Sequence, residues 1–100
     1  MNLIQHYING KLYKGSSSKK GKVYNPATGT QESEVILGTK SDLDHAVENA
    51  KLAFEKWSQV TPLQRARVIF KYKELIEKNY DELIKLIVSE HGKVYDDAKG

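Results

Sequence analysis

Residues 35–57 read VILGTKSDLDHAVENAKLAFEKW, and the spacing of apolar residues changes within this stretch. Val35-Ile36-Leu37 is a short apolar run closed by Gly38, as expected of a strand and the turn that ends it. From Ser41 onward the apolar residues recur every three or four positions, which predicts one face of a helix. That face consists of Leu43, Ala46, Val47, Ala50, Ala53, Phe54 and Trp57.

The start of this helix carries its own signal. Ser41 is a favoured N-cap residue and Asp44 follows three positions later, so we predict a capping box at this pair. Phe54 and Trp57 lie on the apolar face and are expected in the core.

Before this stretch, residues 1–40 predict strands and turns. Tyr7-Ile8 and Leu12-Tyr13 flank Asn9-Gly10, a pair that tolerates the positive φ angles of a type I′ hairpin turn. Asn25-Pro26-Ala27-Thr28-Gly29 is a turn sequence between Val23-Tyr24 and the apolar run at Val35, which predicts a second hairpin. Two hairpins of this size need a partner surface for stability.

After this stretch, Thr61 is predicted to cap a second helix, with Pro62 at its first position and Gln64 reaching back to the cap. Asn79 is expected to end it. The apolar residues of this helix cover so wide an arc that we expect neighbours on more than one side. They are Val68, Ile69, Phe70, Tyr72, Leu75 and Ile76.

A third helix is predicted to begin at Asp81-Glu82 and to end at Gly92 in the left-handed conformation. Its inner stripe is Leu83, Ile84, Ile87, Val88 and His91. Residues 94–99 are typical of the start of another helix. The predicted fold is therefore of the α/β class, with a β-hairpin segment over residues 1–40 and a helical segment with three amphipathic helices over residues 41–100.

Composition excludes several classes of protein. The chain has 100 residues, of which 39% are hydrophobic and 29% charged, as in an ordinary globular domain. Apolar runs are at most three residues long, whereas a membrane-spanning helix needs about 20. The absence of cysteine excludes a disulfide, a thiolate metal site and a cysteine nucleophile within these residues.

Because the first residues resemble neither a signal peptide nor a transit peptide, we predict a cytoplasmic protein without membrane contact.

The net charge of +3 is concentrated in residues 1–40, where six lysines and two acidic residues give +4. A basic tract of this kind can bind nucleic acid. This tract, from Lys11 to Lys22, lacks the alternating aromatic residues of a stacking surface. We therefore interpret it as a solvated hairpin and loop, and predict no nucleic-acid partner.

The sequence contains no recognisable catalytic, cofactor-binding or metal-binding residues. Gly15 to Lys22 resembles a phosphate-binding loop only faintly, because five residues separate its glycines and Val23 stands where Ser or Thr would bind magnesium. No three spaced glycines form a dinucleotide fingerprint. The three histidines, His6, His45 and His91, are too far apart in sequence for a helical metal pair, and His91 is predicted to be partly buried. Capping explains the acidic pairs Asp42/Asp44, Asp81/Glu82 and Asp96/Asp97.

The order of several motifs, however, is similar to the N-terminal fifth of an aldehyde dehydrogenase superfamily enzyme. They are Tyr7-Ile8-Asn9-Gly10, Val23-Tyr24-Asn25-Pro26-Ala27-Thr28-Gly29, Ala46-Val47 with Ala53-Phe54-Glu55-Lys56-Trp57, Pro62-Leu63-Gln64-Arg65-Ala66-Arg67-Val68 and Glu90-His91-Gly92-Lys93. Glu90–Lys93 and Arg65–Val68 are most similar to the CoA-acylating methylmalonate-semialdehyde dehydrogenases.

This resemblance implies that residues 1–100 are part of one incomplete nicotinamide-binding domain. It further implies NAD and CoA as cofactors of a full-length parent, a small aldehyde substrate, and the remainder of the chain and identical subunits as partners. The family's catalytic cysteine, general-base glutamate and cofactor loop lie downstream, so the 100 residues alone are expected to be structural, inactive and free of bound cofactor. The alternatives are a branch of the family that releases a free acid, and a free-standing basic α+β binding module.

Overall fold

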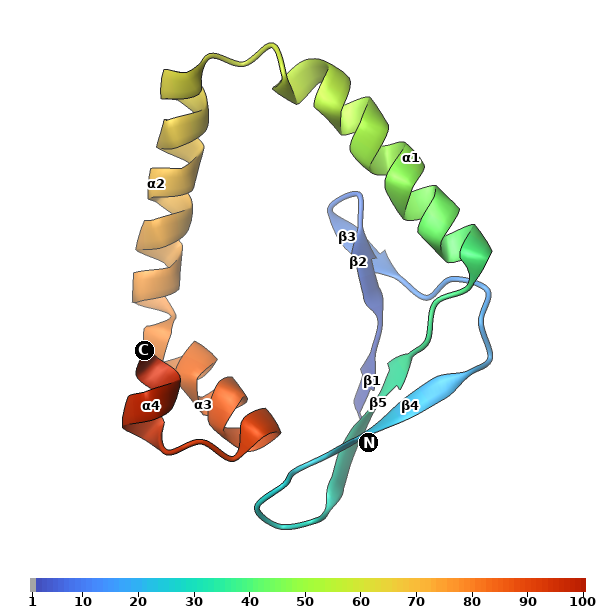
Figure 1. Cartoon of the computed structure of the whole chain (residues 1–100), viewed down its shortest axis with the longest axis vertical. Coiled ribbons are helices and arrows are strands. Elements are labelled where there is room, and N and C mark those ends of the chain that lie inside the picture. Colours follow the sequence, from blue (N-terminus) through green and yellow to red (C-terminus); the bar gives the residue numbers. More distant parts are fainter. Residues whose placement is uncertain (1) are drawn as a thin grey trace. The chain divides into compact units, whose positions relative to one another are not determined.

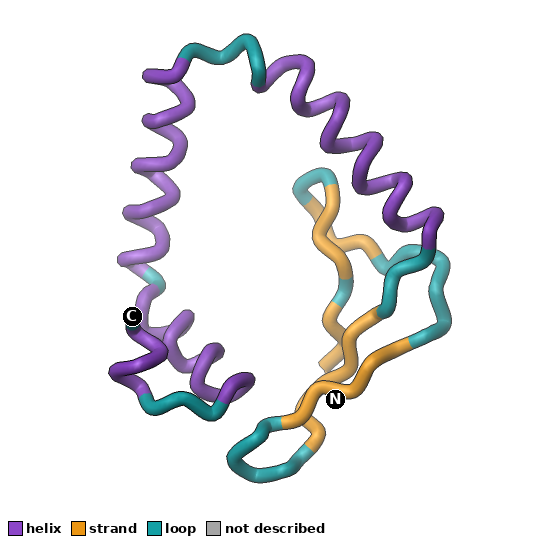
Figure 2. The backbone as a smooth tube through the Cα atoms, viewed as in Figure 1, coloured by secondary structure: helices purple, strands orange, loops and turns teal. Residues whose placement is uncertain are grey.

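A computed structural model describes residues 2–100 of the chain, which form short strands followed by helices (Figures 1 and 2). The strands are β1 (Asn2–Ile4), β2 (His6–Ile8), β3 (Lys11–Tyr13), β4 (Lys20–Tyr24) and β5 (Gln31–Ile36). The helices are α1 (Lys40–Trp57), α2 (Pro62–Lys78), α3 (Tyr80–His91) and α4 (Tyr95–Lys99). The predicted order of strands and then helices is confirmed.

Strand β5 lies at the centre of a three-stranded sheet of order β1-β5-β4. β1 pairs with it in parallel, with Asn2 opposite Ser33 and Ile4 opposite Val35. The sequence does not predict β1, because three residues carry no periodic signal and their partner lies far along the chain. Ser33 and Ile36 of the central strand are buried.

The first predicted hairpin is confirmed. β2 and β3 pair antiparallel, with Ile8 opposite Lys11 across the two-residue turn. Asn9 has a φ of 55° and Gly10 a φ of 74°, and a type I′ turn requires positive φ at both positions.

The second predicted hairpin is also present, although β4 begins at Lys20, three residues before Val23. In its loop, the Asn25 N–H donates to the Thr30 carbonyl at 2.9 Å and the Gly29 N–H to the Asn25 carbonyl at 2.8 Å. The Asn25 side chain accepts from the Ala27 N–H at 2.9 Å. These bonds satisfy the backbone of the loop locally, as Asn and Gly at such positions allow.

The start of α1 corrects one prediction. Thr39, rather than Ser41, is the N-cap, and Asp42, rather than Asp44, completes the capping box. Both pairs have the spacing that a capping box requires. The pair that forms is the one whose carboxylate also contacts the loop at Gly15 and Ser16.

The Thr61 cap and the C-terminal ends of α2 and α3 agree with the sequence, whereas α3 begins at Tyr80, one residue before the predicted Asp81, and the cap of α2 shows only the bond from the Gln64 backbone, without the predicted reach of its side chain. Thr61 caps α2 by accepting a hydrogen bond from the Gln64 N–H at 3.3 Å, and Pro62 occupies the first turn. Asn79 follows the last residue of α2. Gly92 ends α3 with a φ of 80°, a left-handed conformation that a side chain would strain. The fourth helix predicted over residues 94–99 is present as α4.

The described chain forms two compact units. One contains the residues up to Val23 together with Gln31–Gln59, so α1 groups with the strands. The other contains Tyr24–Thr30 and Val60–Gly100. The second unit has its own small core, in which Ile84 and Ala98 are buried.

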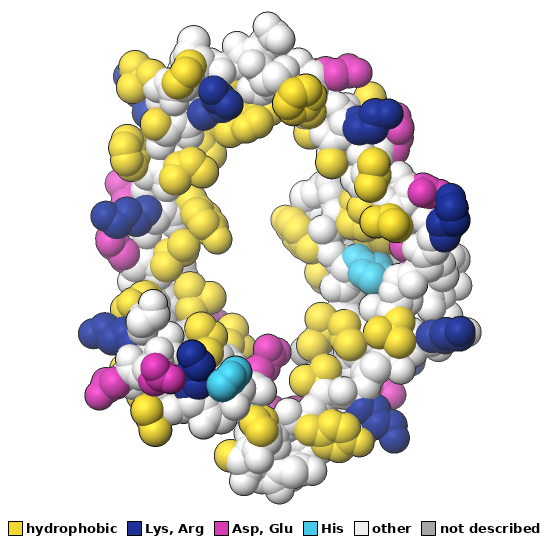
Figure 3. Space-filling model, viewed as in Figure 1, with side chains coloured by type: hydrophobic (Ala, Val, Ile, Leu, Met, Phe, Trp, Pro, Cys, Tyr) yellow, Lys and Arg dark blue, Asp and Glu magenta, His cyan; other side chains and the backbone are white. Residues whose placement is uncertain are grey.

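Burial of the helices corrects further predictions. The sequence places Phe54 and Trp57 in the core, but their side chains are 67% and 41% exposed. Of the predicted inner stripe of α3, only Ile84 is fully buried. Figure 3 shows hydrophobic side chains over much of the visible surface of α1 and α2. The amphipathic pattern predicted helices correctly, but residues 2–100 do not supply the surface that would cover them.

Candidate functional site

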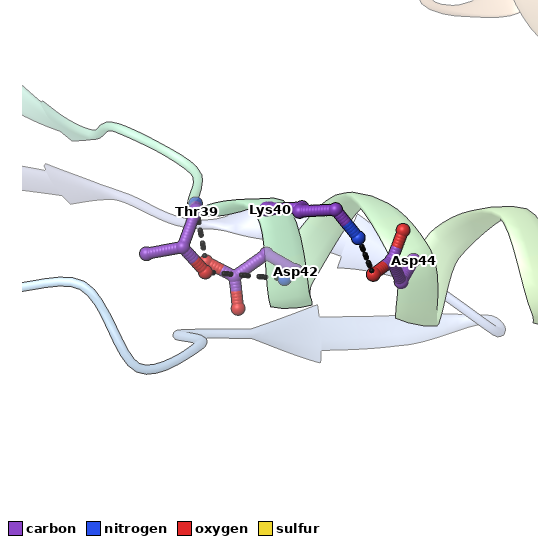
Figure 4. A network of polar contacts seen from close by, with 4 residues as sticks. All are labelled: Thr39, Lys40, Asp42 and Asp44. Atoms are coloured by element: carbon purple, nitrogen blue, oxygen red, sulfur yellow. Dashed lines mark hydrogen bonds and ion pairs between the residues drawn. The ribbon is translucent and has the colours of Figure 1, made fainter.

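The most highly connected polar group of the first unit lies at the start of α1 (Figure 4). The Thr39 N–H donates to Asp42 Oδ2 at 2.9 Å, and the Asp42 N–H donates to the Thr39 hydroxyl at 3.2 Å. Lys40 Nζ lies 2.8 Å from Asp44 Oδ2 on the exposed side of the helix. We call Ser16, Thr39 and Asp42 the α1 cap cluster.

Asp42 also joins the loop after β3 to the helix. Its Oδ1 accepts a hydrogen bond from the Ser16 N–H at 3.4 Å. Gly15 has a φ of 69° and lies so close to this carboxylate that an added Cβ would overlap it, at 2.7 Å from Oδ2. Glycine is therefore required at position 15 for two reasons: the positive φ angle, and the Asp42 carboxylate that lies where a side chain would begin.

The hydrogen bonds hold the pKa of Asp42 below its ordinary value of 3.8. The largest cause is the bond from the Thr39 backbone, which outweighs the opposing effect of burial; the bonds from the Thr39 hydroxyl, the Ser16 backbone and the Tyr13 side chain act in the same direction. A carboxylate with a lowered pKa and engaged oxygens is a poor general base. The bonds of the cap cluster join the loop after β3 to the start of α1.

A groove of about 630 Å³ runs beside the cap cluster, lined by β2 residues and by the start of α1. His6 lines it, and among the described residues its Nε2 is buried without a hydrogen-bond partner. The Tyr13 ring stacks on His45 at 4.7 Å between centroids and lies 6.3 Å from His6. The structure thus brings His6 and His45 to one tyrosine.

No group of three His, Asp or Glu side chains within residues 2–100 is placed to hold a metal ion. His91, predicted to be partly buried, is exposed at the end of α3, because it lies on the last turn where little packs over it. Gly15 to Lys22 leads into strand β4, whereas a phosphate-binding loop leads into a helix.

The second unit contains a polar cluster that sequence reasoning missed. Asp81 in the first turn of α3 accepts from the Tyr95 hydroxyl at 2.8 Å and pairs with Lys85 Nζ at 2.8 Å. Its pKa is lowered, chiefly by the bond from Lys85, and the pKa of Tyr95 is raised, chiefly by its bond to Asp81. Tyr95 is therefore held as a neutral donor. The i,i+4 spacing of Asp81 and Lys85 was a visible signal, but the contribution of Tyr95 depends on how α4 folds back.

The polar clusters of the two units therefore fasten helix ends and loops. Neither cluster has a turn rich in glycine that opens a helix. Within residues 2–100, no helix is both long and apolar enough to cross a membrane.

Comparison with known proteins gives a consistent result. The sequence model of the aldehyde dehydrogenase family matches residues 13–100. Malonate-semialdehyde dehydrogenase 2 of Bacillus cereus is 44% identical over 98 residues, which are 98% of this chain and 20% of the relative. The chain thus spans about a fifth of the length of the curated relatives that it matches.

Solved structures agree over the whole chain. A protein from Sinorhizobium meliloti 1021, assigned as a methylmalonate-semialdehyde dehydrogenase and complexed with NAD, is 43% identical, with a TM-score of 0.97. Methylmalonate-semialdehyde dehydrogenase from Oceanimonas doudoroffii is 41% identical, with a TM-score of 0.95. Each match covers 100% of this chain and 20% of the other.

Proposed function

Because this chain belongs to the aldehyde dehydrogenase family, we propose that it forms part of the nicotinamide-binding domain of an NAD-dependent semialdehyde dehydrogenase. Its role there is structural: the strand segment and the helices each pack against the remainder of the enzyme. The single observation that carries this proposal is the match of the whole chain to one fifth of the relatives, at TM-scores of 0.95 to 0.97.

Exposure of apolar side chains supports the structural role. Val68, Ile69, Phe70 and Tyr72 of α2 are each more than half exposed, and so are Leu43 and Phe54 of α1. So many exposed large apolar side chains on one helix are unusual for a monomer and are typical of an interface. Further parts of the same enzyme would cover it.

The cofactor and the catalytic groups lie outside these residues in this proposal. The described residues do not fit a dinucleotide, because no glycine-rich turn leads from a strand into a helix. The sequence also has no cysteine to act as a nucleophile. The chain alone is therefore expected to show no dehydrogenase activity.

For the whole enzyme we propose oxidation of malonate or methylmalonate semialdehyde with NAD, and transfer of the acyl group to CoA. The identities of 41–44% to relatives with these names support the substrate class, and one such neighbour holds NAD. The CoA step rests on the similarity of Glu90–Lys93 and Arg65–Val68 to that branch. We further propose that the enzyme is a cytoplasmic homo-oligomer.

The test is to assay the protein encoded by the complete reading frame that contains this chain. NADH formation is followed with malonate and methylmalonate semialdehyde, with and without CoA, and the acyl product is identified by mass spectrometry. We expect an acyl-CoA product. Free acid formed in the presence of CoA would reject the acylating branch and favour a hydrolytic one.

Two controls delimit the proposal. The purified 100-residue chain should give no NADH above the blank with either semialdehyde. It should also bind a hydrophobic dye and associate in light scattering, since its helices lack cover. A sharply melting monomer without dye binding would instead favour a free-standing small domain.

A further inference from the structure

One charged residue of α2 lies where the helix is otherwise apolar. Val68, Ile69, Tyr72 and Ile76 follow Arg65 at spacings of three, four, seven and eleven residues, which place all of them on one side of a helix with Arg65. We call these five residues the α2 face. Val68, Ile69 and Tyr72 are 53%, 59% and 60% exposed.

One hydrogen-bond donor of the Arg65 guanidinium lacks an acceptor among residues 2–100. Its Nε is buried, and among residues 2–100 it has no hydrogen-bond partner. A buried donor without an acceptor is costly, and a charge inside an apolar interface must be paired. Arg67, two positions later, is exposed and points to another side of the helix.

We propose that Arg65 anchors the α2 face to a segment of the remaining dehydrogenase chain that presents a carboxylate within apolar side chains. The planar guanidinium matches a carboxylate through two parallel hydrogen bonds, one of them from Nε. The apolar side chains around Arg65 exclude water from the pair. This inference rests on the proposed role of the chain as one part of a larger enzyme.

The length of the relatives and the surface of α2 together identify the occupant. This chain covers 20% of relatives to which it is 41–44% identical, and it adopts their local structure over its whole length. The other four-fifths of such a chain are the partner that is always present at equal concentration. An apolar face with a single cation at its N-terminal end selects a segment of the opposite charge.

The experiment uses a full-length chimaera in which this chain replaces the matched fifth of the Sinorhizobium meliloti relative. Arg65→Met, Arg65→Lys and the matched control Arg67→Met are made in the chimaera and in the 100-residue chain. Thermal unfolding is followed in the chimaera, and helix content and oligomeric state are followed in both.

We expect Arg65→Met to lower the apparent melting temperature of the chimaera by at least about 5 °C, because it leaves a buried carboxylate without a partner. Arg65→Lys keeps the positive charge but loses the two parallel hydrogen bonds of the guanidinium. It should therefore lower the melting temperature by less than Arg65→Met does. Arg67→Met should change it by less than about 1 °C. In the 100-residue chain, Arg65→Met and Arg67→Met should have equal helix content.

Three results would overturn the proposal. The first is equal melting temperatures for the two methionine variants of the chimaera. The second is a chimaera that stays insoluble with Arg65 present, because the relative's segments then fail to pack on this face. The third is a dimer of the 100-residue chain that Arg65→Met dissociates while the chimaera is unaffected, which would identify a second copy as the occupant. Because none of these measurements uses an aldehyde, they can fail independently of the proposed reaction.

Discussion

Replacing Gly15 with alanine is expected to detach the loop after β3 from the start of α1. A side chain at the observed φ of 69° costs about 1–2 kcal/mol. The new Cβ would also lie 2.7 Å from Cγ and Oδ2 of Asp42, closer than real atoms approach. The Asp42 carboxylate cannot retreat without giving up the hydrogen bonds that it accepts from the Thr39 and Ser16 N–H groups, a loss of about 1 kcal/mol. The total is about 2–3 kcal/mol.

Gly10→Ala is the matched control, because Gly10 has a φ of 74° and an added Cβ there meets nothing within 4 Å. It should lose only the backbone contribution of about 1–2 kcal/mol. The difference of about 1 kcal/mol between the variants corresponds to about a fivefold change in the population of the open loop.

Limited trypsin digestion measures that population at the neighbouring Lys14, Lys19 and Lys20. At low protease concentration the cleavage rate follows the equilibrium fraction of open loop. Mass spectrometry of the fragments should show about fivefold faster cleavage at these lysines in Gly15→Ala than in Gly10→Ala. Equal rates in the two variants would refute the reasoning, because they would show that contact between Gly15 and Asp42 does not hold the loop.

Three more predictions concern single side chains. Thr61→Ala should lower the free energy of unfolding of α2 by about 1 kcal/mol and Thr61→Ser should restore it, as measured by urea titration of helix content. Ile84→Ala should cost about 2–5 kcal/mol in the same titration, because Ile84 is 2% exposed, whereas Leu86→Ala, at a site 55% exposed, should stay within about 0.5 kcal/mol. Because folding lowers the pKa of Asp42, its stabilising effect is present above pH 3.8 and is lost as the pH falls below that value; Asp42→Asn should remove this dependence from an acid titration of helix content, and an unchanged acid transition would contradict it.

Local chemistry explains which elements the sequence could predict. Asn9-Gly10 defines its turn by itself, because few residues adopt positive φ, and Gly92 ends α3 for the same reason. Thr61-Pro62 likewise contains the signals for starting a helix. In each case the interactions that decide the structure lie within a few residues.

Predictions failed where contacts with residues distant in sequence determine the structure. Thr39 and Ser41 both begin a capping box, and the structure uses the first, whose Asp42 also meets the loop at Ser16. β1 depends on a partner more than thirty positions later. The apolar stripe of α1 correctly indicated a helix, yet Phe54 is exposed because no described residue covers it.

For the candidate site, too, only part of the result could be predicted from the sequence. No catalytic residue could be assigned from the sequence, and the polar clusters at Asp42 and Asp81 are hydrogen-bonded groups at the starts of α1 and α3. The family, by contrast, was identified from motifs in order, because shared ancestry leaves its signal along the whole chain. The family match over residues 13–100 confirms that identification.

The parallel pairing of β1 with β5 sets an order of events during synthesis. The strand that contains Asn2 can pair only after Ser33, 31 residues later, has been synthesised. At about 5–20 residues per second on the ribosome, that wait lasts about 2–6 s. The β2–β3 hairpin closes within about 1–10 μs of its last residue becoming free. The nascent chain therefore carries an unpaired first strand beside a finished hairpin for seconds, which is the interval in which a chaperone at the ribosome exit could bind it.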